Sequence, residues 1–176
     1  MQLLSEVKLP LYLAAGNPFD VMDRPDVCGR CEGCACFHRN GTYERYMGDV
    51  LRKVARFVCA LCGLTVSVLP AFVLPYRPRL IEEVDRYFQA EAEERPQLSY
   101  ADTLRRYWRE WCAHWPALQR QSGWPPVRPL AREPRGYWRQ LREAAGSLAA
   151  AQKRLIDRYG LSLLRRYACH RAPMRA

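Results

Sequence analysis

The chain has 176 residues, 49% of them hydrophobic and 11% aromatic, and its formal net charge is +10 at pH 7. A hydrophobic content this high supplies a packed core and excludes an intrinsically disordered chain. No apolar run approaches the roughly 18 residues that a membrane span needs, so we expect a cytoplasmic protein, associated with the nucleoid if it binds DNA.

The positive charge is concentrated toward the C-terminus. Residues 1–76 hold 8 basic and 7 acidic side chains, and residues 77–115 hold 7 and 8, so both segments are nearly neutral. Residues 116–176 hold 13 basic against 3 acidic side chains, and 12 of the 13 are arginine. Arginine pairs with phosphate through two hydrogen bonds, so this distribution indicates a nucleic-acid partner. The competing interpretation is a solvated basic surface.

Two Cys-x-x-Cys pairs carry the clearest chemical signal, Cys31 with Cys34 and Cys59 with Cys62. Two residues between cysteines let both sulfur atoms face one ion, and two such pairs separated by strand-like sequence are typical of a tetrahedral zinc site. We therefore expect one structural Zn²⁺ bound by four thiolates. A disulfide framework lacks support, because no apolar signal segment precedes the cysteines.

The first pair has an alternative. Cys28, Cys31, Cys34 and Cys36 lie close together in the sequence, and Cys28-Gly-Arg-Cys31 has the same spacing. We prefer Cys31 with Cys34, because this choice leaves a short run into the first predicted strand, and we keep Cys28 with Cys31 as the alternative. His38 is expected at the surface rather than on the metal.

Three short antiparallel strands are predicted around these pairs. The dipeptides at 40–41 (Asn-Gly) and 48–49 (Gly-Asp) are turn signals. Residues 42–46 alternate polar with aromatic side chains, residues 54–58 return toward the second pair, and residues 64–69 carry β-branched side chains at alternate positions. The N-terminal arm is expected to pack on the segments after it. Together these features predict a small zinc ribbon.

Helices are predicted after an apolar strap. Residues 69–76 contain two prolines and are expected to form an extended segment that joins the ribbon to the helices. Apolar side chains recur at helical spacing over residues 80–94. They recur again from Ser99, the predicted N-cap, to Trp115, and Pro116 is expected to end this helix. Two helices joined by a short turn are typical of a helix-turn-helix DNA reader.

The last third is predicted to be basic and helical after a break. Residues 116–134 are rich in proline and are predicted to be a linker or an irregular loop. One predicted helical face consists of Tyr137, Trp138, Leu141 and Ala145. A later run begins at Ser147 and is capped by Gly160, and a last short helix follows from Ser162. Basic side chains on or beside the apolar helix faces are the predicted nucleic-acid contacts: Arg105, Arg106, Arg109, Arg135, Arg139, Arg142, Lys153, Arg154, Arg158, Arg165 and Arg166.

These expectations define an α+β fold, in which a small N-terminal zinc ribbon of three short antiparallel strands precedes a mostly α-helical bundle. Residues 1–76 are the arm, the ribbon and the strap, and residues 77–115 are the helix pair. Residues 116–134 are the linker or loop, and residues 135–176 are the basic C-terminal helices.

A longer pattern runs through residues 28–80. It consists of Cys31-x-x-Cys34, Phe37-His-Arg-Asn-Gly-Thr-Tyr-Glu-Arg45, Cys59-x-x-Cys62, Gly63-Leu-Thr-Val-Ser-Val-Leu-Pro70 and Leu74-Pro-Tyr-Arg77. On these residues the chain resembles a family of bacterial proteins linked to insertion sequences and transposases, which have a zinc ribbon and a helix-turn-helix-like region. The resemblance implies zinc binding and DNA binding associated with mobile elements, without catalytic activity.

We therefore expect a noncatalytic, zinc-stabilised nucleic-acid-binding protein, with double-stranded DNA as its partner. The alternative is an interaction module or accessory subunit that docks a transposase or another protein through the ribbon and the strap. A third option, a fragment of a transposase, draws on Glu82, Glu83 and Asp85, because such enzymes hold metal ions with carboxylates. Consecutive acids are typical of a solvated helix face, so we expect no enzyme.

Overall fold

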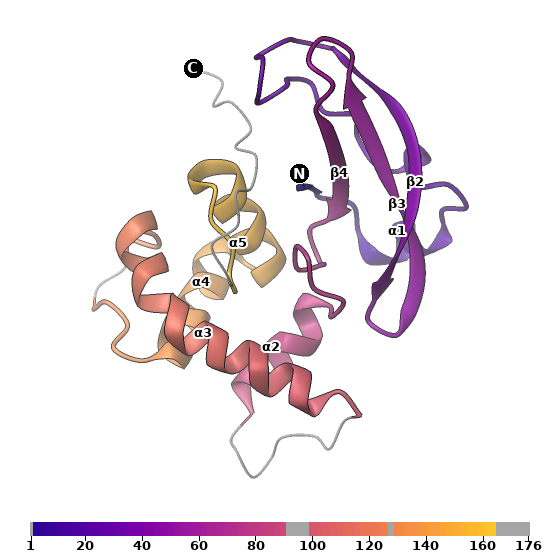
Figure 1. Cartoon of the computed structure of the whole chain (residues 1–176). Coiled ribbons are helices and arrows are strands. Elements are labelled where there is room, and N and C mark those ends of the chain that lie inside the picture. Colours follow the sequence, from indigo (N-terminus) through magenta and orange to yellow (C-terminus); the bar gives the residue numbers. More distant parts are fainter. Residues whose placement is uncertain (1, 91–98, 127–128, 165–176) are drawn as a thin grey trace.

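The structure is a computed structural model, and it describes residues 2–90, 99–126 and 129–164. It is a mixed α+β fold, as predicted, in which the sheet and the C-terminal helices lie side by side (Figure 1). The elements are, in chain order, β1 (Gln2–Ser5), α1 (Leu9–Ala14), the 3-10 turn η1 (Pro18–Asp20), β2 (Phe37–Met47), β3 (Val50–Cys59), β4 (Thr65–Pro70), α2 (Ile81–Gln89), α3 (Ala101–Ser122), α4 (Pro134–Ala145), α5 (Leu148–Arg154) and the π-helical turn η2 (Leu155–Tyr159).

The four strands form one sheet in the order β1-β4-β3-β2. β2 and β3 make an antiparallel hairpin of 11 and 10 residues, in which Phe37 lies opposite Cys59 and Met47 lies opposite Val50. β4 is antiparallel to β3, whereas β1 is parallel to β4. The prediction of three short strands is therefore wrong in two respects. The hairpin strands are long, and the N-terminal arm packs on the sheet as a fourth strand.

The two predicted turns have different outcomes. Gly48 has a φ of +66° and lies in the tight turn between β2 and β3, as predicted. Asn40 and Gly41 lie inside β2 instead, where the register shifts between Arg39 and Thr42. Gly41 has a φ of +70°, a conformation that suits glycine and that marks a β-bulge here. The Asn-Gly signal therefore reports a local kink in a continuing strand.

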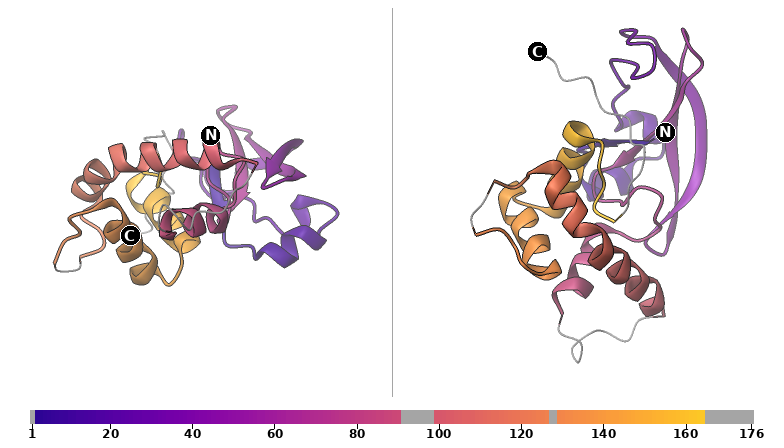
Figure 2. Two further views of the ribbon diagram at one scale, coloured as in Figure 1. Left: turned by 90° about the horizontal axis from the view of Figure 1, so that it is seen from below. Right: turned by 60° about the vertical axis from the view of Figure 1, so that its left-hand side comes forward.

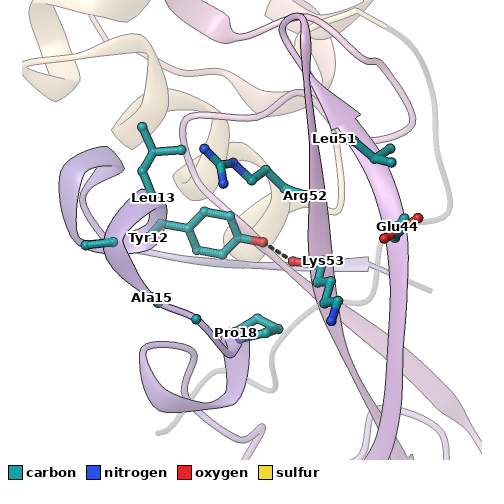
Figure 3. A pocket seen from close by; sticks show the side chains of 10 residues that line it. Tyr12, Leu13, Ala15, Pro18, Glu44, Leu51, Arg52 and Lys53 are labelled. Atoms are coloured by element: carbon teal, nitrogen blue, oxygen red, sulfur yellow. Dashed lines mark hydrogen bonds between the residues drawn. The ribbon is translucent and has the colours of Figure 1, made fainter.

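Tyr12 anchors α1 to the sheet. Its hydroxyl donates to the backbone carbonyl oxygen of Lys53 in β3 over 2.6 Å, and its ring lies edge-on to Phe72 with centroids 5.9 Å apart. Burial, followed by the nearby Tyr43, raises the pKa of Tyr12 to about 12, so the hydroxyl keeps the proton that it donates. Figure 3 shows this side chain reaching from α1 to β3 beside a hollow of about 370 Å³.

Residues 69–76 join two hydrophobic cores, as the predicted strap requires. The sheet core lies on the strands and includes Val73, and the helix core lies among the C-terminal helices and includes Leu74. The segment is not helical, and after Pro70 it follows turns rather than a straight extended course. Ile156 of η2 belongs to the sheet core, so the two halves also meet through the C-terminal helices.

The predicted aromatic stripe of α3 is core. Tyr107 and Trp111 are completely buried, and Trp111 stacks on Tyr137 of α4 with centroids 5.8 Å apart. Trp111 also lies edge-on to Trp138, 4.9 Å away between centroids. Figure 2 shows the long α3 lying against the other C-terminal helices. The aromatic side chains of α3 therefore hold the helices together.

The predicted limits of α3 are wrong. The helix runs through Pro116 to Ser122 and ends at Gly123, whose φ is +58°. A proline removes only one hydrogen-bond donor, so a long helix packed on a core can pass through it. Residues 116–122 of the predicted linker therefore belong to α3. The N-cap is Tyr100 rather than Ser99.

The caps of the C-terminal helices match the prediction. Ser147 accepts a hydrogen bond from the backbone N–H of Ala150 over 3.1 Å at the start of α5, and Gly160 ends η2 with a φ of +63°. Residues 161–164 are not helical, and the rest of the helix expected from Ser162 lies outside the described residues, as does the predicted end of α2 near Glu94. Within the described ranges, no helix combines the length and apolar character needed to cross a bilayer.

Candidate metal centre

Four thiols meet beside the end of the hairpin that carries Cys59. The Sγ atoms of Cys28, Cys31, Cys59 and Cys62 all lie within 4.8 Å of one another. Cys28 and Cys59 are buried, Cys62 is half-buried and Cys31 is exposed, so the cluster opens to solvent on one side. In the part of the chain that the structure describes, this is the only group of three or more His, Cys, Asp or Glu side chains placed to share an ion.

The two halves of the cluster repeat one backbone pattern. The N–H of Glu32 donates to the carbonyl of Cys28 over 2.7 Å, and the N–H of Gly63 donates to the carbonyl of Cys59 over 2.9 Å. Glu32 and Gly63 both have a left-handed backbone, with φ of +58° and +71°. Each half is therefore a tight knuckle that turns two sulfur atoms inward, the local geometry expected of a structural metal site.

The preferred first pair is corrected to the alternative, Cys28 with Cys31. Cys34 is exposed and forms an isolated antiparallel bridge with Val27. Residues paired across such a bridge point to the same side, and their chain neighbours point to the other. Cys28 follows Val27 and points into the cluster, so Cys34 points away from it. The choice of Cys31 with Cys34 depended on the length of the run into the strand, which does not determine the direction of the Cys34 side chain.

The spacing of the sulfur atoms fits a tetrathiolate ion. A tetrahedral ion with metal–sulfur bonds of about 2.3 Å separates its sulfur atoms by about 3.8 Å. The Sγ atoms of Cys28 and Cys62 are 3.6 Å apart, and those of Cys31 and Cys59 are 3.7 Å apart. Two of the six Sγ–Sγ separations thus match a tetrahedral ion, and the other four are no longer than 4.8 Å.

The cluster is poorly able to ionise without a cation. Burial acts to raise the pKa of Cys59, but a hydrogen bond from the backbone of Cys62 and the hydrogen-bond contact with the Cys36 side chain lower it to about 6. For Cys62, the backbone of Leu64 acts to lower the pKa, whereas burial and the thiols of Cys28 and Cys59 raise it to about 12. The thiolate of Cys59 therefore keeps the neighbouring Cys62 protonated. A bound cation removes that repulsion, so metal binding releases protons.

A glycine lies where the two knuckles approach each other. A Cβ atom added to Gly33 would lie 2.5 Å from Leu61 Cδ1 and 3.4 Å from Cys31 Sγ. Leu61 is 70% exposed, so its terminal methyl group would have to rotate away to admit a side chain at this position. Gly33 was not among the predicted site residues.

The predicted nucleic-acid contacts that the structure describes fall into three groups. Arg109 and Arg139 are exposed and have no ion-pair partner among the described residues. Three others are ion-paired within the chain: Arg105 with Asp102, Arg142 with Asp85, and Lys153 with Asp157. Four lie over aromatic rings, with guanidinium carbons 4.9 to 5.9 Å from the ring centroids: Arg106 over Tyr107, Arg135 over Trp108, Arg154 over Trp124, and Arg158 over Tyr159. Arg165 and Arg166 lie outside the described residues.

α3 exposes one basic face. Arg105, Arg106 and Arg109 are exposed, and Arg120 follows Arg109 by three helical turns, so these four side chains share one side of the helix. Asp102, the acid on this side, pairs with Arg105 over 2.8 Å. The helix has 22 residues and is about 33 Å long. Arg120 was missed as a predicted contact, because the helix was expected to end before it.

Two of the three acidic side chains of α2, Glu83 and Asp85, hold the fold together. Glu83 Oε2 accepts a hydrogen bond from the backbone N–H of Leu80 over 2.8 Å and so caps its own helix. Asp85 Oδ1 accepts from Trp138 Nε1 over 2.9 Å. Glu82 is exposed. The carboxylates of Glu83 and Asp85 are therefore explained by helix capping and by packing between helices.

Comparison with known proteins adds no family to this description. No family model matches the chain, and no match was found among curated proteins or solved structures. What the protein does is therefore argued from the thiol cluster and from the basic face of α3.

Proposed function

We propose that the protein is a noncatalytic, zinc-stabilised nucleic-acid-binding protein, and that its partner is double-stranded DNA. The donor set supports zinc, because four thiolates at tetrahedral spacing suit Zn²⁺ and exclude ions that prefer oxygen ligands. With one Zn²⁺ on Cys28, Cys31, Cys59 and Cys62, the two knuckles and the strands β2, β3 and β4 make a zinc ribbon, which β1 extends.

The metal has a structural role in this proposal. All four candidate ligands come from the protein, so a tetrahedral ion has no open position for a substrate. The ion ties the loop before β2 to the turn between β3 and β4, next to the backbone hydrogen bond from the N–H of Ala60 to the carbonyl of Cys36. Residues 1–76 are nearly neutral, so this half presents little charge to a polyanion.

The basic face of α3 is the observation that carries the proposal of nucleic-acid binding. Its exposed arginines lie between Arg105 and Arg120, about 22 Å along the helix axis, which is roughly two thirds of one turn of duplex DNA. The opposite face of α3 is buried in the helix core, which holds the helix rigid. A rigid row of guanidinium groups can contact successive phosphates without ordering a loop first.

The choice of DNA and the link to mobile elements depend on the resemblance to insertion-sequence proteins. In this proposal α3 takes the place of the second helix of a helix-turn-helix reader, with α2 before it. Phosphate contacts by arginine do not recognise base sequence by themselves, so the geometry supports affinity for duplexes of any sequence.

Docking of another protein is the second candidate, and one observation favours it. Leu61 lies between the two cysteines of the second knuckle and is 70% exposed. The apolar strap cannot serve this function as expected, because Val73 and Leu74 are buried in the chain's own cores. A docking surface would therefore use the tip of the second knuckle.

Fluorescence anisotropy with a labelled 20-base-pair duplex tests the proposal. We expect binding at low salt, with log affinity falling linearly as log salt rises. Competing duplexes of unrelated sequence should bind nearly as well, and double-stranded RNA should compete less. Absence of binding at low salt would overturn nucleic-acid binding and leave the docking of another protein as the better candidate.

A further inference from the structure

A fifth thiol touches the metal centre without belonging to it. Cys36 is 7% exposed, and its Sγ atom lies 3.4 Å from the Sγ atom of Cys59, closer than the 3.6 and 3.7 Å separations within the cluster. Its thiol donates to the carbonyl oxygen of Gly33 over 3.1 Å. A tetrahedral ion on the other four sulfur atoms leaves Cys36 as a protonated neighbour of one ligand.

The geometry points to a function for this contact: Cys36 and Cys59 form a disulfide when the protein meets a peroxide, and the metal centre loses one of its four thiols. The proposal concerns the chain's own sulfur atoms and does not depend on nucleic-acid binding. Its second consequence, release of the metal, rests on the proposed zinc site, and one experiment separates the two.

The reaction balances with hydrogen peroxide as the oxidant. The Cys59 thiolate attacks one peroxide oxygen, the O–O bond breaks, and the products are a sulfenic acid at Cys59 and hydroxide, which takes a proton from solvent. The Cys36 sulfur then attacks the Cys59 sulfur, gives up its proton, and the sulfenic hydroxyl leaves as water. The two sulfurs lose two electrons in total, and the peroxide becomes two molecules of water.

The backbone already holds the two cysteines at the right place. The N–H of Ala60 donates to the carbonyl of Cys36 over 2.8 Å, and Phe37, the next residue, lies opposite Cys59 in the hairpin. A disulfide has an S–S bond of about 2.05 Å, so the sulfur atoms need to approach by about 1.4 Å, within reach of side-chain rotation. Cys31 is exposed, so a small oxidant reaches the cluster from that side.

Cys34 provides the matched control. It lies two residues before Cys36 and is exposed, but it is outside the cluster. Zinc-loaded wild type and the variants Cys36→Ser, Cys36→Ala and Cys34→Ser would be treated with hydrogen peroxide. Metal release is followed with a chromogenic chelator. After alkylation of the remaining thiols, digestion and fragmentation mass spectrometry identify the cross-linked cysteines.

We expect a Cys36–Cys59 cross-link and metal release in wild type and in Cys34→Ser, both reversed by dithiothreitol and added zinc. The Cys36 variants should bind one equivalent of metal before oxidation, form no such cross-link, and keep their metal longer under peroxide. A cross-link between two other cysteines, or equally fast release from the Cys36 variants, would overturn the proposal. Loss of metal from both Cys36 variants without peroxide would overturn it too, since Cys36 would then be a ligand. If the wild type forms the cross-link but holds no metal, the disulfide stands and the zinc proposal fails.

Discussion

Three arginines on the basic face of α3 should supply a measurable share of the affinity for DNA. Arg105 is ion-paired, which leaves Arg106, Arg109 and Arg120 available for phosphate. Each phosphate contact contributes about 0.9 to the slope of log affinity against log salt. Replacing all three by glutamine should therefore reduce the slope by about 2.7. At 0.1 M salt each contact is worth about eightfold, so binding should weaken roughly 500-fold.

The assay is fluorescence anisotropy of a labelled duplex between 50 and 400 mM NaCl. A variant with Lys8→Gln, Arg24→Gln and Lys53→Gln loses the same charge from exposed positions of the sheet half and serves as the control. It should keep the wild-type slope within about one contact. Equal losses in the two variants would show that net charge, and not the face of α3, determines binding. An unchanged slope in the α3 variant would refute the assignment of this face.

The other predictions concern stability and are checked by urea unfolding. Burial raises the pKa of Tyr137 to about 12 in the folded chain, so the stability from its protonated hydroxyl is complete below pH 10 and is lost as the pH rises through 12. Tyr137 should account for up to about 2.7 kcal/mol of the stability that wild type loses across this window, to which Tyr12 also contributes, and Tyr137→Phe should lose correspondingly less; identical pH profiles would contradict this. Leu141 is fully buried between α4 and its neighbours, so Leu141→Ala should cost about 2–5 kcal/mol, and a loss under about 1 kcal/mol would show a looser helix core. Glu32 has a φ of +58°, so Glu32→Gly should raise the free energy of unfolding by about 0.5–1 kcal/mol, and a decrease would show that its side chain matters.

The metal centre shows which of its ligands could be predicted from the sequence. The pair Cys59 and Cys62 and the intervening hairpin were predictable, because Cys-x-x-Cys spacing is a local constraint that survives in any fold. The choice between Cys28 and Cys34 was not, because it depends on which way each side chain points. That direction is set by the bridge between Val27 and Cys34, a contact with no signature in the sequence.

Helices were predicted more reliably than their ends. Apolar side chains at helical spacing located α2, α3 and α4, since burying one face of a helix requires that spacing. The local signal of Pro116 was overridden, because Leu118 of the last turns is completely buried in the helix core. Packing at that position offsets the lost hydrogen bond, and nothing in the local sequence reports it.

The β-bulge at Gly41 illustrates the same limit in the sheet. Asn-Gly is a strong signal for a hairpin turn when two strands of matched length flank it. Here the partner strand continues past it, with Arg39 opposite Phe57 and Thr42 opposite Ala55. The dipeptide supplies the positive φ that either structure needs, so the sequence alone does not distinguish a turn from a bulge.

Metal analysis of the purified protein and two serine variants tests the central claim most directly. Protein expressed in zinc-supplemented medium would be measured by inductively coupled plasma mass spectrometry as wild type, Cys28→Ser and Cys34→Ser. The structure places Cys28 in the cluster and Cys34 outside it. We predict one zinc per chain in wild type and in Cys34→Ser, and a clear loss in Cys28→Ser. A wild type without metal, or zinc lost from Cys34→Ser and retained by Cys28→Ser, would contradict the account.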